Sequence, residues 1–380
     1  MSDFCDATYT YYSMDHLPDY DNLTVNNRST KRIKLRKYAI YLTCILVLTI
    51  IMTGVILILK QKRLNKKIKI ILSTPKPIKH NISFNCQLPI NPTYKKNCTI
   101  VAGVLSTSND KLNELNGPTS VYLDREKNIY VADTTNHRIR KYSSENSNTS
   151  ETLIDETSNI NYPRCLFIDQ ESNYLFFLDQ DNQGYYRVQL LKLNSNPLKS
   201  TILVVGNQTR SYGMSLDEDF NIYVSEYNNH RIVKWLSPNY NNYLIIVVEN
   251  QLTYPKSIYI DQKTNNLYVA DKNRIQCWIN NSNKSQIVMQ GGSVCPNAIE
   301  YDCHGNLYIS QDRTIKLINQ NTGLPGIDII GIQSYSQWVQ NFRKNDDFSY
   351  PEGIYLDKTN GDLYVTDSSF NLIEKFTIEF

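Results

Sequence analysis

Six positions of the chain could bring together side chains of different chemistry. Each lies directly before a small residue in one of six similar segments, which follow one another at spacings of 41 to 55 residues. The six residues are Thr119, Arg164, Tyr212, Lys256, Asn297 and Glu352. Because the segments are repeats of one unit, we expect these side chains to form a ring around the mouth of a channel, where a ligand could bind. The alternative interpretation is a solvated channel lining.

The small residues that follow these positions suit a crowded innermost strand near the axis of the channel. They are Ser120, Cys165, Gly213, Ser257, Ala298 and Gly353. Cys165 is therefore interpreted as a packing residue rather than as a nucleophile. We predict no catalytic residue from the sequence.

Metal chemistry is poorly supported by the sequence. None of the five His has a second His at ligand spacing, and the eight Cys contain no C-x-x-C pair. The segment that starts at Asp179 begins like a calcium-binding loop, but its twelfth residue is Leu190, where a Glu is required. We therefore predict no metal site and no cofactor.

The elements that would position the ring are short strands. Each segment contains an apolar strand that ends in Asp, a short turn, a second apolar strand, another turn and a third strand. The Asp recurs at positions 124, 169, 217, 261, 302 and 357. Periods of roughly 40–50 residues with three or four short strands each are typical of propeller blades. We predict an all-β fold, a six-bladed β-propeller over residues 98–380.

A ring of blades needs a closing device, because an open ring would leave sheet edges exposed. Residues 99–104 resemble the outer strand of the other segments and precede the first full segment, whereas the sequence stops just after the third strand of the last one. We expect residues 99–104 to complete the sixth blade and to join the two ends of the ring without a disulfide.

The segments resemble NHL repeats. The motif is carried by Asn136-His137-Arg138-Ile139 after Val131-Ala132-Asp133, by Asn229-His230-Arg231-Ile232 after Val224-Ser225-Glu226, and in short form by Asn273-Arg274-Ile275. The resemblance covers roughly residues 98–380 and implies the propeller fold. Because the motif recurs in several blades, we interpret its Asp, Asn and His as architectural and expect its Arg to pair across blades.

The resemblance leaves the function open, because one fold hosts many functions. NHL proteins include tripartite-motif ubiquitin ligases that bind RNA, but their zinc-binding Cys/His pairs are absent here. Residues 97–380 carry 24 basic and 32 acidic residues, and this net charge of −8 disfavours phosphate contacts. NHL-like amidating lyases hold zinc in their propeller, and their ligand set cannot be placed on this sequence.

A membrane segment precedes the repeats. Residues 38–59 contain no charged side chain, and 22 helical residues can cross the hydrocarbon core. The basic residues that follow and the long, initially acidic region before it fit a signal-anchor helix better than a cleaved signal peptide. We predict a disordered cytosolic tail over residues 1–37, a transmembrane helix over 38–59 and a basic, Pro-containing stalk over 60–97.

The orientation in the membrane is not fixed by charge, because six basic residues flank each end of the helix. Six glycosylation sequons after the helix favour an extracellular or luminal propeller, at Asn81, Asn97, Asn148, Asn207, Asn280 and Asn283. Sequons at Asn22 and Asn27 favour the opposite orientation. Disulfides form outside the cell, and we predict the pair Cys86–Cys98, which flanks the loop leading into the propeller.

Together these observations favour a single-pass membrane protein that presents its propeller as a binding module for a protein, a peptide or a glycan. The competing interpretations are a propeller lyase or hydrolase that uses the channel mouth, and an intracellular NHL scaffold. An enzyme should hold convergent ionisable residues or a metal in one part of the channel.

Overall fold

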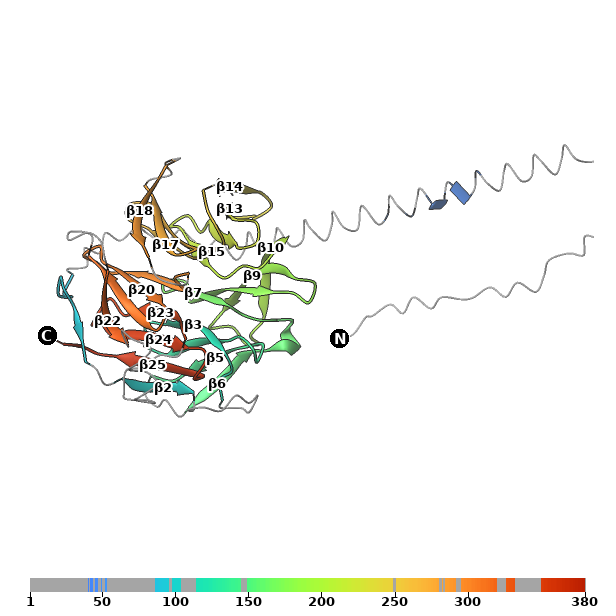
Figure 1. Ribbon diagram of the computed structural model, residues 1–380. Helices are drawn as coiled ribbons and strands as arrows, with labels where there is room; N and C mark the ends of the chain where they lie inside the picture. The colour runs from blue at the N-terminus through green and yellow to red at the C-terminus, as the bar shows by residue number, and fades with distance from the viewer. Residues whose placement is uncertain are drawn as a thin grey trace, which may run out of the picture. The chain divides into compact units, whose positions relative to one another are not determined.

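The fold is described from a computed structural model of the chain (Figure 1). The described residues are 86–95, 98–103, 114–144, 149–248, 251–279, 282, 284–291, 295–319, 326–331 and 350–379, with isolated positions between 40 and 52. The chain divides into two compact units, Met1–Lys66 and Lys67–Phe380. The described positions of the first unit are helical. Among the residues that the structure describes, no helix is long and apolar enough to cross a membrane.

The second unit is a six-bladed propeller of four-stranded antiparallel sheets. Blade 1 contains β3 (Pro118–Leu123), β4 (Ile129–Asp133), β5 (Arg138–Tyr142) and β6 (Ser150–Ile154), and blade 2 contains β7 (Cys165–Asp169), β8 (Tyr174–Gln180), β9 (Tyr185–Lys192) and β10 (Ser200–Gln208). Blade 3 contains β11 (Met214–Leu216), β12 (Ile222–Glu226), β13 (Arg231–Trp235) and β14 (Tyr243–Val247), and blade 4 contains β15 (Pro255–Asp261), β16 (Asn266–Asp271), β17 (Arg274–Trp278) and β18 (Ser285–Gln290). Blade 5 contains β19 (Ala298–Tyr301), β20 (Leu307–Gln311), β21 (Thr314–Ile318) and β22 (Ile327–Gly331), and blade 6 contains β23 (Pro351–Leu356), β24 (Leu363–Asp367), β25 (Leu372–Phe376) and β2 (Thr99–Gly103).

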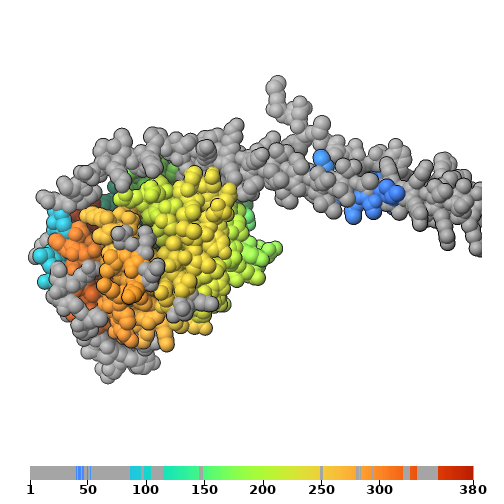
Figure 2. All heavy atoms as spheres, turned by 90° about the horizontal axis from the view of Figure 1, so that it is seen from above, coloured from blue at the N-terminus to red at the C-terminus, as the bar shows by residue number. Residues whose placement is uncertain are grey.

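The blades stack face to face around a central axis. Each innermost strand contacts the innermost strands of both neighbouring blades, which closes the ring. Seen at right angles to Figure 1, blades 3 to 5 follow one another in chain order from green through yellow to orange (Figure 2). Strand β4, the second strand of blade 1, is buried at every position because both faces of the sheet are covered. The outer strand β14 is largely exposed.

The predicted closure of the ring is confirmed. Strand β2 pairs with β25, with Thr99 opposite Lys375 and Gly103 opposite Leu372, so an N-terminal strand completes the last blade (Figure 1). A second tie lies beside it, where β1 (Thr93–Tyr94) pairs with β26 (Ile378–Glu379). A short 3-10 helix, η1 (Glu156–Ser158), connects blades 1 and 2.

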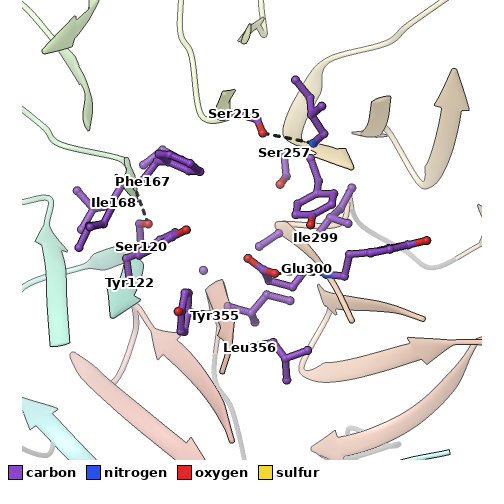
Figure 3. A pocket seen from close by; sticks show the side chains of 18 of the residues that line it. Ser120, Tyr122, Phe167, Ile168, Ser215, Ser257, Ile299, Glu300, Tyr355 and Leu356 are labelled. Atoms are coloured by element: carbon purple, nitrogen blue, oxygen red, sulfur yellow. Dashed lines mark hydrogen bonds between the residues drawn. The ribbon is translucent and has the colours of Figure 1, made fainter. Parts of the chain in front are cut away.

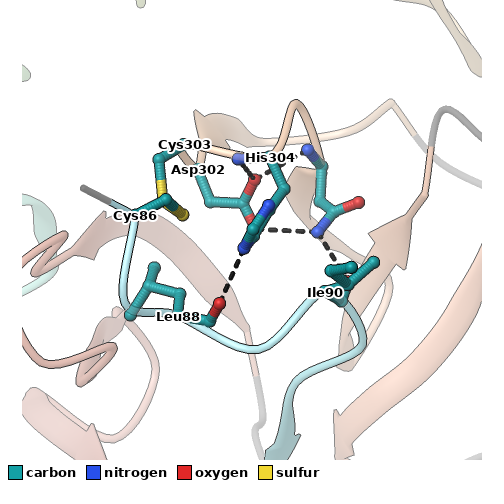
Figure 4. Close-up of a disulfide and its surroundings, with 7 residues drawn as sticks. Cys86, Leu88, Ile90, Asp302, Cys303 and His304 are labelled. Carbon is teal, nitrogen blue, oxygen red and sulfur yellow. Dashed lines mark hydrogen bonds between the residues drawn. A yellow bond between two sulfur atoms is a disulfide. The ribbon is translucent and has the colours of Figure 1, made fainter. Parts of the chain in front are cut away.

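The predicted disulfide Cys86–Cys98 is wrong, because Cys86 is bonded to Cys303 in the turn between β19 and β20 (Figure 4). Residues 86–90 run along this turn, where Leu88 O lies 2.6 Å from His304 Nε2. Cys98 lies in blade 6 instead, and its Sγ contacts Glu374 Oε1 at 3.8 Å. The segment that separates the two predicted partners thus passes from one blade to the next.

The predictions for the tail, the membrane segment, the stalk and the sequons fall mostly outside the described residues. These include the tail over 1–37, most of the transmembrane segment over 38–59, most of the stalk over 60–97, and the sequons other than Asn207. Asn207 is half-buried, and its Nδ2 donates to Glu226 Oε1 at 3.0 Å. The atom to which a glycan would be attached is therefore engaged within the propeller.

Candidate functional site

The candidate site is the central channel. Its cavity has a volume of about 1060 Å³ and is lined by the innermost strands of all six blades. All six residues predicted to form a ring line this cavity, namely Thr119, Arg164, Tyr212, Lys256, Asn297 and Glu352. We call this set the channel mouth. The structure therefore brings the predicted residues together, and ligand binding by them stays a prediction.

Lys256 links most of the channel mouth. Its Nζ donates to Asn297 Oδ1 at 2.5 Å and lies 3.8 Å from Glu352 Oε1. The same ammonium lies 5.6 Å from the ring centroid of Tyr212, and the Arg164 guanidinium lies 4.8 Å from that centroid. These distances are within the range of cation–π contacts. The mouth is thus a connected set of cationic, anionic, amide and aromatic groups.

Exposed tyrosines surround the channel mouth. Tyr254 and Tyr350 precede the proline that begins their blades, and they are 45% and 39% exposed. The ring centroid of Tyr227 lies 5.0 Å from that of Tyr254 and 5.1 Å from that of Tyr212, and Lys256 Nζ lies 5.7 Å from the Tyr350 centroid. Our prediction from the sequence missed these tyrosines. The recurring Tyr-Pro pair could have indicated them.

The two motif histidines join neighbouring blades. Tyr162 donates its backbone N–H to His137 Nδ1 at 3.2 Å, and Tyr254 donates its N–H to His230 Nδ1 at 2.9 Å. Each His ring also contacts the ring of the tyrosine that it holds, at centroid distances of 4.2 and 4.4 Å. Both histidines therefore hold the start of the next blade, in keeping with the architectural role predicted for them.

The ion pairs of the motif arginines Arg138, Arg231 and Arg274 lie within their own blades, so the expectation of pairs across blades is wrong. Arg138 Nε donates to Asp133 Oδ2 at 2.6 Å, and the two residues face each other on adjacent strands of one blade. Arg231 makes the same contact with Glu226, also at 2.6 Å. The reason is the register of the second and third strands, which places the motif acid directly opposite the motif arginine.

A second ring of side chains lies deeper in the channel, two residues beyond the small residue of each innermost strand. Its members are Tyr122, Phe167, Ser215, Tyr259, Glu300 and Tyr355, which all line the cavity (Figure 3). We call this set the inner chamber. The inner chamber was not predicted from the sequence, although alternate residues of a strand share one face and could have indicated it.

The inner chamber combines aromatic faces with one carboxyl group. The Tyr122 ring centroid lies 5.7 Å from that of Phe167 and 4.7 Å from that of Tyr355. Glu300 points from β19 into the open space between these rings (Figure 3). Burial raises the pKa of the Glu300 carboxyl, while Lys358 acts in the opposite direction.

Lys358 reaches the inner chamber from the turn between β23 and β24. Its Nζ donates to the Tyr259 hydroxyl at 3.3 Å and lies 5.5 Å from the Tyr259 ring centroid.

Cys165 is unsuited to nucleophilic chemistry. Burial raises the pKa of its thiol to about 11, and its Sγ donates weakly to Met214 O at 3.6 Å. This environment supports the predicted packing role of Cys165.

One group of described residues has the composition of a metal site. The ligand atoms of Cys86, Cys303 and His304 lie within 4.8 Å of one another. The two sulfur atoms are bonded to each other, and the Nε2 of His304 contacts Leu88 O. These three residues therefore do not fit a metal ion (Figure 4).

Comparisons with known proteins agree with the fold. The NHL repeat model matches residues 115–142 and 348–376, in blades 1 and 6. No curated protein sequence matches the chain at a significant level.

Solved structures with a similar fold include a lyase, a binding protein and a lactonase. Streptogramin B lyase is 15% identical, with a TM-score of 0.54 over 74% of this chain and 98% of that one. An auxiliary nutrient binding protein from Bacteroides thetaiotaomicron is 13% identical, with a TM-score of 0.58 over 76% and 78% of the two chains. A gluconolactonase from Xanthomonas campestris is 10% identical, with a TM-score of 0.56 over 76% and 95%. At these identities the likeness concerns the fold alone.

Proposed function

We propose that this protein, a six-bladed β-propeller with NHL repeats, is a recognition module that binds a protein, a peptide or a glycan at its channel mouth. We further propose that a single membrane-spanning segment over residues 38–59 presents the propeller on the extracellular or luminal side. The uncharged character of this segment and the sequons that follow it support that arrangement.

The observation that carries the proposal is the chemical variety of the channel mouth. The blades are repeats, yet the six mouth residues comprise two bases, an acid, an amide, a hydroxyl and a phenol. Such a set can match one ligand in shape, charge and hydrogen bonding, which a uniform lining cannot. The surrounding tyrosines add rigid amphipathic contact area, which is frequent in recognition surfaces.

The proposal is tested by screening the purified full-length chain against immobilised peptides and glycans. We expect binding to a defined subset, and loss of that binding in Lys256→Ala and Tyr212→Ala. Glu151→Gln is the matched control, because its carboxyl lies on the outer strand β6 with the side chain 63% exposed. Binding that is equal in the mouth variants and in the control, with all variants folded, would contradict the proposal.

An enzyme that uses the same channel is the second candidate. The observation that favours it is Glu300, a half-buried residue whose carboxyl has a raised pKa and faces open space, as a general acid or base requires. Turnover of an ester, lactone or other candidate substrate by the full-length chain, lost in Glu300→Gln, would replace the binding module with this function.

A further inference from the structure

The inner chamber differs in chemistry from the channel mouth above it. The mouth contains two basic side chains, whereas three of the six chamber residues are tyrosines, one is Phe167 and the one carboxyl group is that of Glu300. These residues come from different innermost strands, so their positions relative to one another are fixed by the closed ring of blades. The chamber is therefore a preformed aromatic site with one carboxyl group.

The Glu300 carboxylate has no close cationic partner among the residues that the structure describes. Its Oε2 accepts the backbone N–H of Tyr301 at 3.3 Å, and no described Lys or Arg lies within 4.0 Å of it. A carboxylate that is partly removed from water is stabilised by an opposing cation. In its ionised form Glu300 can therefore oppose a cationic ligand group, and Lys358 is the protein cation that acts on it from beyond 4.0 Å.

The cavity as a whole also carries a net negative charge, like Glu300. Among the described lining residues, eight are acidic and six are basic. The acids are Asp124, Asp169, Glu171, Asp261, Glu300, Asp302, Glu352 and Asp357, and the bases are Arg125, Lys127, Arg164, Lys256, Lys263 and Lys358. A cavity with net negative charge and low-dielectric walls attracts cations.

We propose that the inner chamber binds a ligand through an alkylammonium group, with Glu300 opposing the charge and the faces of Tyr122 and Tyr355 surrounding the methyl or methylene groups. Cation–π contact with tyrosine is a general mode of ammonium recognition. The chamber already accommodates one ammonium group, because Lys358 Nζ donates to the Tyr259 hydroxyl at 3.3 Å. The inference deepens the proposed function, on which it rests, by naming the chemical class of ligand that enters through the mouth.

The test uses choline as the probe and its uncharged carbon isostere, in which the quaternary nitrogen is replaced by carbon, as the matched ligand control. Binding to the purified full-length chain is measured by isothermal titration calorimetry. We expect choline to bind and the isostere to bind more weakly. Glu300→Gln should weaken choline binding by roughly ten- to a hundredfold and leave the isostere unaffected.

Two further variants separate the aromatic and electrostatic contributions. Tyr355→Phe should leave choline binding unchanged, whereas Tyr355→Ala should weaken it by about two- to fivefold, because the ring face and not the hydroxyl makes the contact. Lys358 is a like charge in the chamber, but it also lowers the pKa of Glu300. Lys358→Met should therefore tighten choline binding on the plateau at higher pH, where Glu300 is ionised in both chains. Equal binding of choline and its isostere, or weaker choline binding in Lys358→Met on that plateau, would overturn the proposal.

The pH dependence gives an independent readout. The groups that interact with Glu300 are Lys358, the Cys165 thiol and the phenols of Tyr122, Tyr259 and Tyr355. Burial raises the pKa of the thiol and of each phenol, so these groups stay neutral near neutral pH. Choline affinity should therefore rise with pH through the raised pKa of Glu300 and then level off, with no such rise in Glu300→Gln. A flat profile for the native chain across acidic to neutral pH, or no choline binding at all, would contradict the inference.

Failure of this inference can be distinguished from failure of the proposed function. The mouth variants Lys256→Ala and Tyr212→Ala are assayed on peptides and glycans, whereas Glu300→Gln is assayed on choline. Loss of array binding in the mouth variants without choline binding would retain the recognition module and reject the ammonium site. Folding of each variant is checked by its thermal unfolding midpoint, with Glu151→Gln as the control.

Discussion

Closure of the propeller depends on a close approach of backbones that only glycine permits at position 353. A Cβ built on Gly353 would lie 2.6 Å from Thr119 O and 2.9 Å from Ser120 Cα, in the strand of blade 1 that faces blade 6. Both contacts are shorter than a Cβ tolerates, and both involve backbone, which cannot rotate away. Gly353→Ala must therefore push two innermost strands apart at the point where the first and last full blades meet.

The expected cost can be bounded from the behaviour of overpacked cores. Forcing an additional methyl group into a close-packed interface costs typically about 1–3 kcal/mol. For a domain of this size each kcal/mol lowers the unfolding midpoint by roughly 2–4 °C. We expect Gly353→Ala to lower the free energy of unfolding by about that amount and the midpoint by several degrees. The same displacement would move Thr119, a residue of the channel mouth, so ligand binding should weaken as well.

Thermal and urea-induced unfolding of the full-length chain, followed by circular dichroism, measures this effect. Ser257→Ala is the matched control, because it changes the same position of blade 4 in a direction that only removes atoms. We expect the control to unfold close to the native chain. An unchanged midpoint in Gly353→Ala would refute the argument that this position is limited by backbone contact.

Three other perturbations have expected outcomes. His230→Ala should lower the free energy of unfolding by about 1 kcal/mol, because the Tyr254 N–H loses its acceptor. Chemical denaturation measures this change, and an unchanged midpoint would contradict the linking role of the histidine. Cys303→Ser should lower the free energy of unfolding by about 2–4 kcal/mol, because it removes the disulfide to Cys86. It should also abolish the difference in gel mobility between the reduced and the oxidised chain, and a persisting difference would indicate another pairing. Asn207→Gln should leave unchanged the gel-mobility shift that endoglycosidase produces in the chain expressed in cells, because the Asn207 amide is hydrogen-bonded to Glu226. Loss of the other five predicted sequons should remove this shift, and no shift in the native chain would argue against an extracellular propeller.

The sequence predicts those features that repeat symmetry determines. The six mouth residues could be placed on one ring because each occupies the same position before a small residue, and a propeller superimposes such positions. The strand over residues 99–104 could be assigned to the last blade because its pattern matches that of an outer strand. The structure follows both expectations at the level of the fold, with β2 pairing to β25.

Features that break the repeat could not be predicted in the same way. The partner of Cys86 depends on the path of a segment that belongs to no blade, and this path brings it to the turn that contains Cys303. The pairing of Arg138 with Asp133 depends on strand register within a blade, which the motif alone does not specify. The inner chamber, by contrast, follows from the alternation of side chains along a strand, because its residues lie two positions beyond the small residue of each innermost strand.

The residues that recur in every blade and those that differ between blades have different roles, and this difference indicates where a ligand would bind. The motif acids are satisfied inside their own blades, as Asp133 with Arg138 and Glu226 with Arg231 illustrate. Their contacts leave them little capacity to bind anything else, and they lie at separate places around the ring. Some mouth and chamber side chains also bond to the next blade, as Thr119 does to Arg164 O and Asn297 to Pro351 O. Their chemistry nevertheless differs from blade to blade, because no common motif pairing fixes it. We therefore expect a ligand site where equivalent positions of the six blades carry different residue types, which is along the central axis.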